Sequence, residues 1–132
     1  MRHKKAWAAE RLELGRIGEA KAVLYLTRLG YEIITRNYRT PLGEIDIIAR
    51  EGRQLVFVEV RTRASASLGP PFLSVTRKKQ RKIIHNALCY VKRYGLTDSP
   101  WRIDIVSVKL KDGHGVDEIL LFRDAVLDHF YI

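Results

Sequence analysis

The sequence is poor in the residues that hold small proteins together through covalent bonds or metal clusters. It contains one cysteine, Cys89, which excludes an internal disulfide and fits a reducing compartment, so we expect a cytoplasmic protein. Its four histidines show no zinc-binding spacing. There is no P-loop, no dinucleotide-binding glycine motif and no nucleophile elbow. These absences argue against common nucleotide-dependent enzymes and serine hydrolases.

Long hydrophobic runs are also missing. Residues 1–7 are basic and have no apolar stretch behind them, so we expect neither a signal peptide nor a membrane span. With 132 residues, of which 46% are hydrophobic and 30% charged, the chain has the size and composition of one globular domain. We therefore predict a single domain over residues 1–132, in which residues 1–14 form a loose basic arm that becomes helical.

Acidic residues are few relative to basic ones. The chain has 15 Asp and Glu against 24 Lys and Arg, which gives a net charge of +9. Such an excess favours a polyanionic partner, first nucleic acid and second an anionic membrane surface. Charge alone does not choose between the two; we predict nucleic acid, either DNA or RNA, as the partner and no membrane. The sequence leaves open whether the protein forms a homodimer.

The most informative acids lie within residues 43–63, which are predicted to form two strands joined by a tight turn at Gly52. Residues 44–49 alternate acidic and aliphatic side chains, and residues 55–61 are rich in β-branched and aromatic ones. Strands of a buried sheet seldom carry carboxylates, yet these carry Asp46 and Glu59. A two-residue turn at 51–52 makes the two acids diagonal neighbours on one face, a four-residue loop opposes them directly, and a three-residue loop separates their faces.

Two carboxylates on one face repel each other unless a positive charge lies between them. We therefore predict a site for Mg²⁺ or Mn²⁺ at Asp46 and Glu59, because hard cations take carboxylate oxygens and keep waters for a phosphate. Arg61 shares the face of Glu59 and is predicted to steady a water or the charge that develops on a phosphate. The alternative is a solvated sheet face with a cross-strand ion pair.

Two helices flank this hairpin in the sequence. The first is predicted to end at Leu29, with Gly30 as its C-cap, and its apolar stripe includes Glu19. That carboxylate either satisfies the helix dipole or an arginine, or it is a third metal ligand; the residues alone leave both open. The second helix is predicted over residues 77–94, with Thr76 as its N-cap and Gly95 as its end.

The second helix begins with five cations in six positions, interrupted by Gln80, which lies on the inward stripe. Cations are unfavourable at a helix N-terminus unless a phosphate binds there. We therefore predict contacts with a nucleic-acid backbone, although a solvated basic face is the alternative. The predicted nucleic-acid-binding residues are Arg63, Arg77, Lys78, Lys79, Arg81 and Lys82.

Three further strands are predicted over residues 31–38, 101–110 and 118–122. Asp104, on the second of these, either faces solvent or pairs with Arg102, and we do not assign it to the site. The loop over residues 64–74 is long for a compact domain, which is consistent with a mobile flap or with disorder. The order helix, three strands, helix, two strands predicts an α/β domain with a mixed β-sheet, in which the second helix is the crossover.

Several blocks of the sequence resemble the YraN-like bacterial proteins, a largely uncharacterised family: residues 15–20, 37–39, 43–46 and 57–61. Asp46, followed by Glu59-Val60-Arg61, also resembles the PD-(D/E)xK nuclease signature, and the family is similar in fold to archaeal Holliday-junction resolvases. The resemblance covers about residues 15–130 and implies a restriction-endonuclease-like sheet flanked by helices. The chain departs from the signature at Arg61, where these nucleases have lysine.

The resemblance implies roles for individual residues. It favours Glu19 as a metal ligand beside Asp46, Glu59 and the Val60 carbonyl, and Gln80 is similar to a helix amide near the metal site of related nucleases. The implied activity is metal-dependent hydrolysis of phosphodiester bonds in DNA, with branched or damaged DNA as a candidate substrate and Asp46, Glu59, Arg61 and Gln80 as catalytic residues. An alternative source of the missing lysine is Lys78 or Lys79. Two other functions stay open: a nucleic-acid-binding module with little or no catalysis, and an adaptor for an acidic protein.

Overall fold

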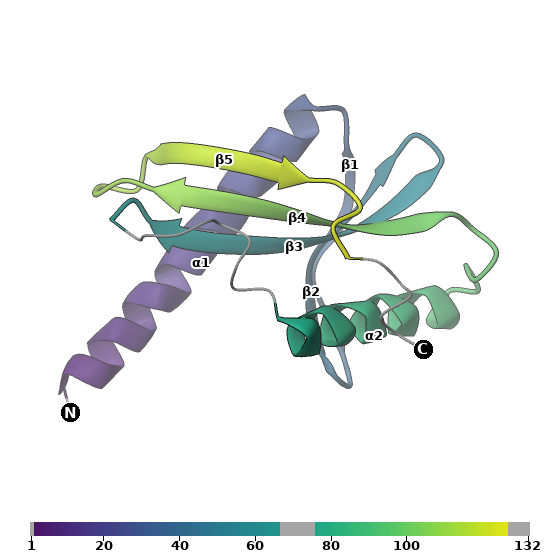
Figure 1. Cartoon of the computed structure of the whole chain (residues 1–132), viewed down its shortest axis with the longest axis horizontal. Coiled ribbons are helices and arrows are strands. Elements are labelled where there is room, and N and C mark those ends of the chain that lie inside the picture. Colours follow the sequence, from purple (N-terminus) through teal and green to yellow (C-terminus); the bar gives the residue numbers. More distant parts are fainter. Residues whose placement is uncertain (1, 67–75, 127–132) are drawn as a thin grey trace.

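The elements of the chain follow the predicted order αβββαββ (Figure 1). The computed structural model describes residues 2–66 and 76–126, with side chains from residue 8 onward. Its elements are α1 (Arg2–Arg28), β1 (Glu32–Thr40), β2 (Gly43–Glu51), β3 (Gln54–Ala64), α2 (Arg77–Arg93), β4 (Trp101–Leu110) and β5 (Val116–Phe122). The predicted α/β class is therefore confirmed.

The five strands form one mixed sheet in the order β1-β2-β3-β4-β5. Neighbouring strands are antiparallel except β3 and β4, which pair in parallel along their length from Leu55–Trp101 to Ala64–Leu110. Parallel neighbours need a crossover connection, and α2 lies in that connection. The predicted role of the second helix is confirmed.

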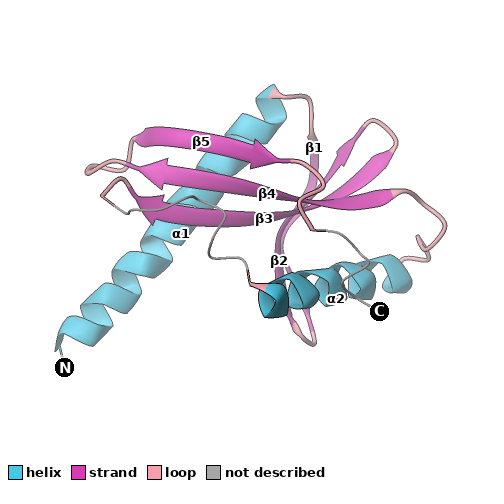
Figure 2. Ribbon diagram, viewed as in Figure 1, coloured by secondary structure: helices cyan, strands magenta, loops and turns pink. Residues whose placement is uncertain are grey.

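The two helices cover opposite faces of the sheet (Figure 2). On one face, α1 buries Ala22 and Leu26 against side chains of β2, β3 and β4, among them Val58. On the other face, α2 buries Ile84 and Val91 against side chains that alternate with those, such as Phe57. The sheet is therefore apolar on both faces where the helices cover it.

Two boundaries differ from the prediction. Helix α1 begins at Arg2, so the segment that we expected to become helical within residues 1–14 is helical from the start of its described part. Residues 2–14 contain neither glycine nor proline and are rich in strong helix formers, which explains the helix. Most of the predicted loop over residues 64–74 lies outside the described residues, since β3 extends to Ala64 and the description stops at residue 66.

No helix in the described part of the chain is long and apolar enough to cross a membrane.

Asp104 anchors a buried polar network near the turn between β2 and β3. Its side chain is fully buried and accepts hydrogen bonds from Tyr31 Oη at 2.8 Å and from Arg102 Nε at 2.9 Å. Arg102 also donates to Glu51 at 2.7 Å. A buried carboxylate needs such donors, so the predicted pairing with Arg102 is the arrangement found, and the side chain has a structural role.

Gly18 sets how closely α1 approaches β3. A Cβ atom at this position would lie 1.9 Å from Thr62 Oγ1, which is far inside van der Waals contact. Only glycine permits this approach without a shift of the helix. The contact matters for the site because Glu19 is the next residue of the helix. Gly15, one turn earlier, has no atom within 4 Å of the corresponding Cβ position.

We predict opposite effects for alanine at these two glycines. Gly18→Ala should lower the free energy of unfolding by roughly 1–3 kcal/mol, because the added methyl group overpacks the contact with Thr62. Gly15→Ala should raise it by up to about 1 kcal/mol through helix propensity alone. Denaturant unfolding of both variants measures the difference. Equal gains in stability would show that Gly18 does not set the position of the helix.

Candidate functional site

The register between β2 and β3 brings Asp46 opposite Glu59. The ladder runs from Glu51–Gln54 to Ile47–Val58, so the next opposed positions are 46 and 59. This is the directly opposed arrangement that we considered for a four-residue loop. The chain reaches it with a two-residue turn at Gly52 and Arg53, where Gly52 has a φ of 60°. Both acids therefore lie just beyond the last paired residues of the hairpin.

The strand β2 changes face at Asp46. Ile47 packs in the core beneath α1, whereas Ile45 packs in the core beneath α2, although regular alternation would place both on one face. In β1, Asn37 lies opposite Asp46 and has a φ of 53°, a left-handed conformation inside a strand. This irregular residue lets the hairpin tip turn toward α2 while β3 continues along β4 (Figure 1). A break between β2 and β3 is the result, and Asp46 lies in it.

A backbone hydrogen bond holds the carboxylate of Asp46 in this break. Val60 N donates to Asp46 Oδ2 at 2.8 Å, so the side chain takes a backbone donor of β3 beyond the end of the ladder. Asp46 and Val60 line a hollow of about 550 Å³ on the α1 side of the sheet. Glu59 lines a second hollow, of about 230 Å³, on the α2 side. The two acids therefore line hollows on opposite sides of the sheet, and Glu44 lines both hollows.

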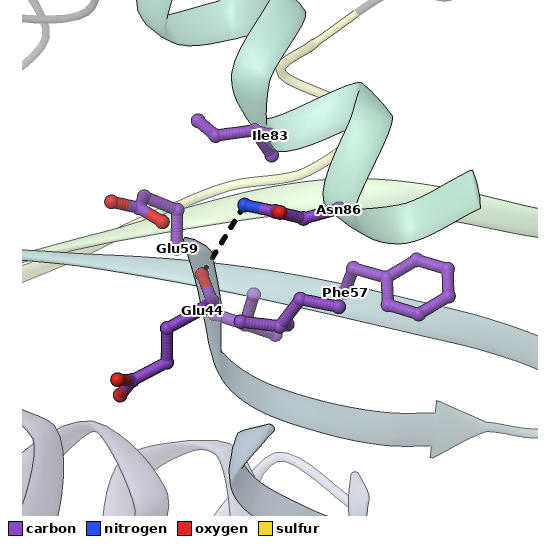
Figure 3. A pocket seen from close by; sticks show the side chains of 7 residues that line it. Glu44, Phe57, Glu59, Ile83 and Asn86 are labelled. Atoms are coloured by element: carbon purple, nitrogen blue, oxygen red, sulfur yellow. Dashed lines mark hydrogen bonds between the residues drawn. The ribbon is translucent and has the colours of Figure 1, made fainter. Parts of the chain in front are cut away.

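The α2 side of the site is built around Asn86 (Figure 3). Its buried side chain accepts a hydrogen bond from Thr40 Oγ1 at 2.5 Å and donates to the Glu44 carbonyl at 3.5 Å, which ties the tip of the β1–β2 hairpin to α2. The carboxylates of Glu44 and Glu59 both point to the side away from Phe57. The sequence analysis missed Asn86 and Glu44. Their signals were an amide within the apolar stripe of α2 and an acid two residues before Asp46.

Burial and mutual repulsion raise the pKa values of both central acids. Desolvation is the largest cause for Asp46, whose pKa rises to about 6; Glu19 and Glu44 raise it further, and the bond from Val60 opposes the rise. Desolvation and then the charge of Asp46 raise the pKa of Glu59 to about 8. The protein therefore holds two carboxylates where their negative charge is unfavourable, which is typical of functional sites.

Arg61, a predicted site residue, lies beside Glu59. Its Nε atom lies 3.9 Å from Glu59 Oε1 and has no hydrogen-bond partner within the described residues. A guanidinium at this distance lowers the pKa values of both acids without overcoming their burial. Arg61 is therefore placed to interact with a further anion beside Glu59.

Glu19 reaches the site but is engaged by an arginine. It lines the same hollow as Asp46 and accepts a hydrogen bond from Arg36 Nε at 3.2 Å. Of the two interpretations left open, the structure contains the ion pair. Within the residues that the structure describes, no three acidic, histidine or cysteine side chains are grouped so that they could hold a metal. Asp46 and Glu59 are the two acids with raised pKa values at the site, and Glu19 could join them only after it leaves Arg36.

The basic start of α2 is partly directed at the site. Thr76 caps the helix as predicted, because its hydroxyl accepts from Lys79 N at 3.2 Å. Lys79 and Lys82 line the hollow that contains Glu59 and Arg61. Arg63 lines a neighbouring hollow that also includes Arg61. The remaining predicted residues of α2 line none of these three hollows, and their roles stay predictions: Arg77, Lys78, Gln80 and Arg81.

Sequence comparison places this site within a known family. The profile of the uncharacterised protein family UPF0102 matches residues 18–108, which is more than half of the chain. The chain belongs to UPF0102. It is 47% identical to a UPF0102 protein of Geotalea uraniireducens over 89% of this chain and 91% of the relative. A relative from Desulfosudis oleivorans is 48% identical over 88% and 91%, and one from Caldicellulosiruptor saccharolyticus is 44% identical over 86% and 96%.

The UPF0102 match confirms the family part of the resemblance. It extends from Gly18 to Val108 and so includes the Gly18 contact and the whole of α2. It also includes the four acids that line the hollows, which are Glu19, Glu44, Asp46 and Glu59. The relatives are also described only as UPF0102 proteins, and that name states no activity. What the site of this UPF0102 protein does must therefore be argued from its geometry.

The raised pKa values predict that the charged pair destabilises the protein. A carboxyl group whose pKa is higher in the folded state stabilises the fold at low pH, and this contribution is lost as the pH rises through the folded value. Between about pH 4 and pH 8, the two acids should therefore lower stability as the pH increases. Without divalent metal, Glu59→Gln should raise the free energy of unfolding at pH 8 by roughly 1–3 kcal/mol. The advantage should shrink toward pH 5.

Thermal or denaturant unfolding in EDTA across this pH range measures the effect. The matched control is Glu118→Gln, an exposed acid of β5, which should change stability little at either pH. A Glu59→Gln variant that is no more stable than the wild type at pH 8 would contradict the proposed desolvation of the pair.

Proposed function

We propose that this protein is a metal-dependent endonuclease with a restriction-endonuclease-like site, which hydrolyses phosphodiester bonds in DNA. The observation that carries the proposal is the pair Asp46 and Glu59, two half-buried carboxylates with raised pKa values on neighbouring strands at a break in the sheet. Such a pair is unfavourable on its own and becomes favourable with a divalent cation between the oxygens. The DNA backbone supplies the anion that the nearby cations lack.

The residues that would hold Mg²⁺ or Mn²⁺ are Asp46, Glu59 and the carbonyl of Val60. The carboxylate of Asp46, on β2, already accepts a hydrogen bond from Val60 N of β3, so this carboxylate and the Val60 backbone are held together. When bound, such a cation lowers the pKa of a coordinated water and stabilises charge on a phosphate. Glu19 is a further ligand only if Arg36 releases it, and a phosphate that binds Arg36 would favour that release.

The neighbouring cations would position the substrate. Arg61 stays protonated at any ordinary pH, so it can donate hydrogen bonds to a phosphate or a water but cannot act as a general base. Its Nε atom is buried without a hydrogen-bond partner in the described structure, whereas the side chain as a whole is 26% exposed, so its Nη groups would bind a phosphate oxygen beside Glu59. Lys79 and Lys82 would bind the adjacent backbone from α2.

A second candidate is a nucleic-acid-binding module with little or no catalysis. Two observations favour it: an arginine stands where related nucleases have lysine, and Glu19 is paired with Arg36. In that case the cations around the site would hold DNA or RNA through its phosphates, and the loss of Asp46 would not weaken binding. An adaptor for an acidic protein would instead lose its partner when nucleic acid is added as a competitor.

Cleavage assays separate the first two functions. We expect the wild-type protein to cleave at least one of three DNA substrates with Mg²⁺ or Mn²⁺ and none in EDTA: a four-way junction, a single strand or a linear duplex. Asp46→Asn should lower the rate by about 10²–10³-fold, as for the loss of one preorganised charged group. The matched control is Asp112→Asn, an exposed acid in the turn between β4 and β5, which should leave the rate unchanged.

Tight DNA binding without cleavage in either metal would contradict the enzyme and favour the binding module. Cleavage that persists undiminished in Asp46→Asn would place the activity elsewhere.

A further inference from the structure

We propose that the hollow on the α1 side binds the backbone of one unpaired nucleic-acid strand as it leaves the carboxylates. This inference rests on the proposed function, because it names the class of substrate that the same site would take. The residues that carry it are four arginines, Arg11 and Arg16 of α1 and Arg36 and Arg39 of β1, which line the hollow together with Asp46. None of these arginines was assigned a function from the sequence.

The charges of this hollow favour an added anion. Arg36 is paired with Glu19 at 3.2 Å, whereas Arg11, Arg16 and Arg39 are exposed and make no ion pair within the described residues. Three guanidinium groups from two separate elements therefore face one concavity without a partner. Guanidinium groups bind phosphate oxygens in bidentate geometry and stack on bases, so a strand of nucleic acid satisfies both of their binding modes.

The size of the hollow fits part of one strand. Its volume of about 550 Å³ lies within the range of about 300–1,000 Å³ that holds a small ligand, so it can take a few groups of one backbone. Leu12, with 64% of its surface exposed, lines the same hollow and offers an apolar contact for an unstacked base. Single strands are bound in this way, through a basic groove with surfaces on which bases can lie.

This hollow shares one acidic residue with the hollow on the α2 side. Glu44 lines both this hollow and the one formed by Arg61, Lys79 and Lys82. Arg11 also lines the neighbouring hollow that contains Arg61. A strand held by the lysines of α2 on one side of Asp46 and Glu59 can therefore be held by the arginines on the other side. The acids repel a phosphate, so cations on both sides are needed to keep the strand in place.

The consequence is a preference among substrates. DNA that has an unpaired strand, such as a single strand or a fork with splayed arms, can reach the arginines of the α1 side. A blunt duplex can reach only the lysines of α2. Binding to the first two substrates should therefore depend on the arginines, and binding to the blunt duplex should depend on them much less.

Paired triple variants test this. The test variant is Arg11→Gln, Arg16→Gln and Arg39→Gln together. The control variant is Arg28→Gln, Arg53→Gln and Lys111→Gln, which removes the same charge from exposed residues that line none of the three hollows described above. Fluorescence anisotropy in EDTA measures binding of a labelled single strand, a fork and a blunt duplex of the same sequence, each about 20 nucleotides long, across a salt series.

We expect the test variant to bind the single strand and the fork at least about tenfold more weakly than the control variant. Its salt slope on the single strand should be smaller by about 2, since each lost phosphate contact removes about 0.7. On the blunt duplex the two variants should agree within about threefold. Equal losses for both variants, or an equal loss on all three substrates, would overturn the proposal.

The measurement is independent of catalysis. A wild-type protein that binds these substrates but never cleaves them refutes the proposed enzyme and leaves this strand-binding site intact if the variants differ as expected. A protein that cleaves DNA while both triple variants bind alike refutes only the strand-binding site. A wild-type protein that binds none of the three substrates refutes both.

Discussion

The repulsion between Asp46 and Glu59, two half-buried carboxylates on neighbouring strands, is the constraint on which the rest of the site depends. Opposed strands bring the two carboxylates together, and burial keeps water from screening them, so their pKa values rise to about 6 and about 8. Such an arrangement persists only where the surrounding structure fixes both strands, and it lowers the stability of the free protein. Binding of a cation and a phosphate would turn the same arrangement into a stabilising one.

The fold fixes these strands through local irregularities. Asn37 takes a left-handed conformation opposite Asp46, and β2 changes face there, which opens the break in which the carboxylate lies. Asn86 ties the hairpin tip to α2, and Gly18 lets α1 lie close against β3. Each of these residues acts on the position of the acids without being one of them. The position of the two acids therefore depends on residues from α1, β1 and α2.

Much of this arrangement was predictable because it follows from short-range patterns. Alternation, glycine positions and the Thr76 cap predicted the element order, and the hairpin pattern placed Asp46 and Glu59 on neighbouring strands. What the sequence left open or missed depends on contacts between distant residues. The pairing of Glu19 with Arg36, the face change at Asp46 and the burial of Asn86 need the positions of two or three elements at once. The helix propensity of residues 2–14 explains why α1 begins at Arg2.

The most direct test of the central claim is to locate a metal ion. Crystals grown at about pH 8 and soaked with Mn²⁺ allow the ion to be placed by anomalous diffraction. The account predicts an anomalous peak within coordination distance, about 2.1 Å, of carboxylate oxygens from both Asp46 and Glu59, and no such peak in crystals of the Asp46→Asn variant. A wild-type map without a peak at this position, with Arg61 bonded directly to Glu59, would contradict it and leave a structural ion cluster in place of the metal site.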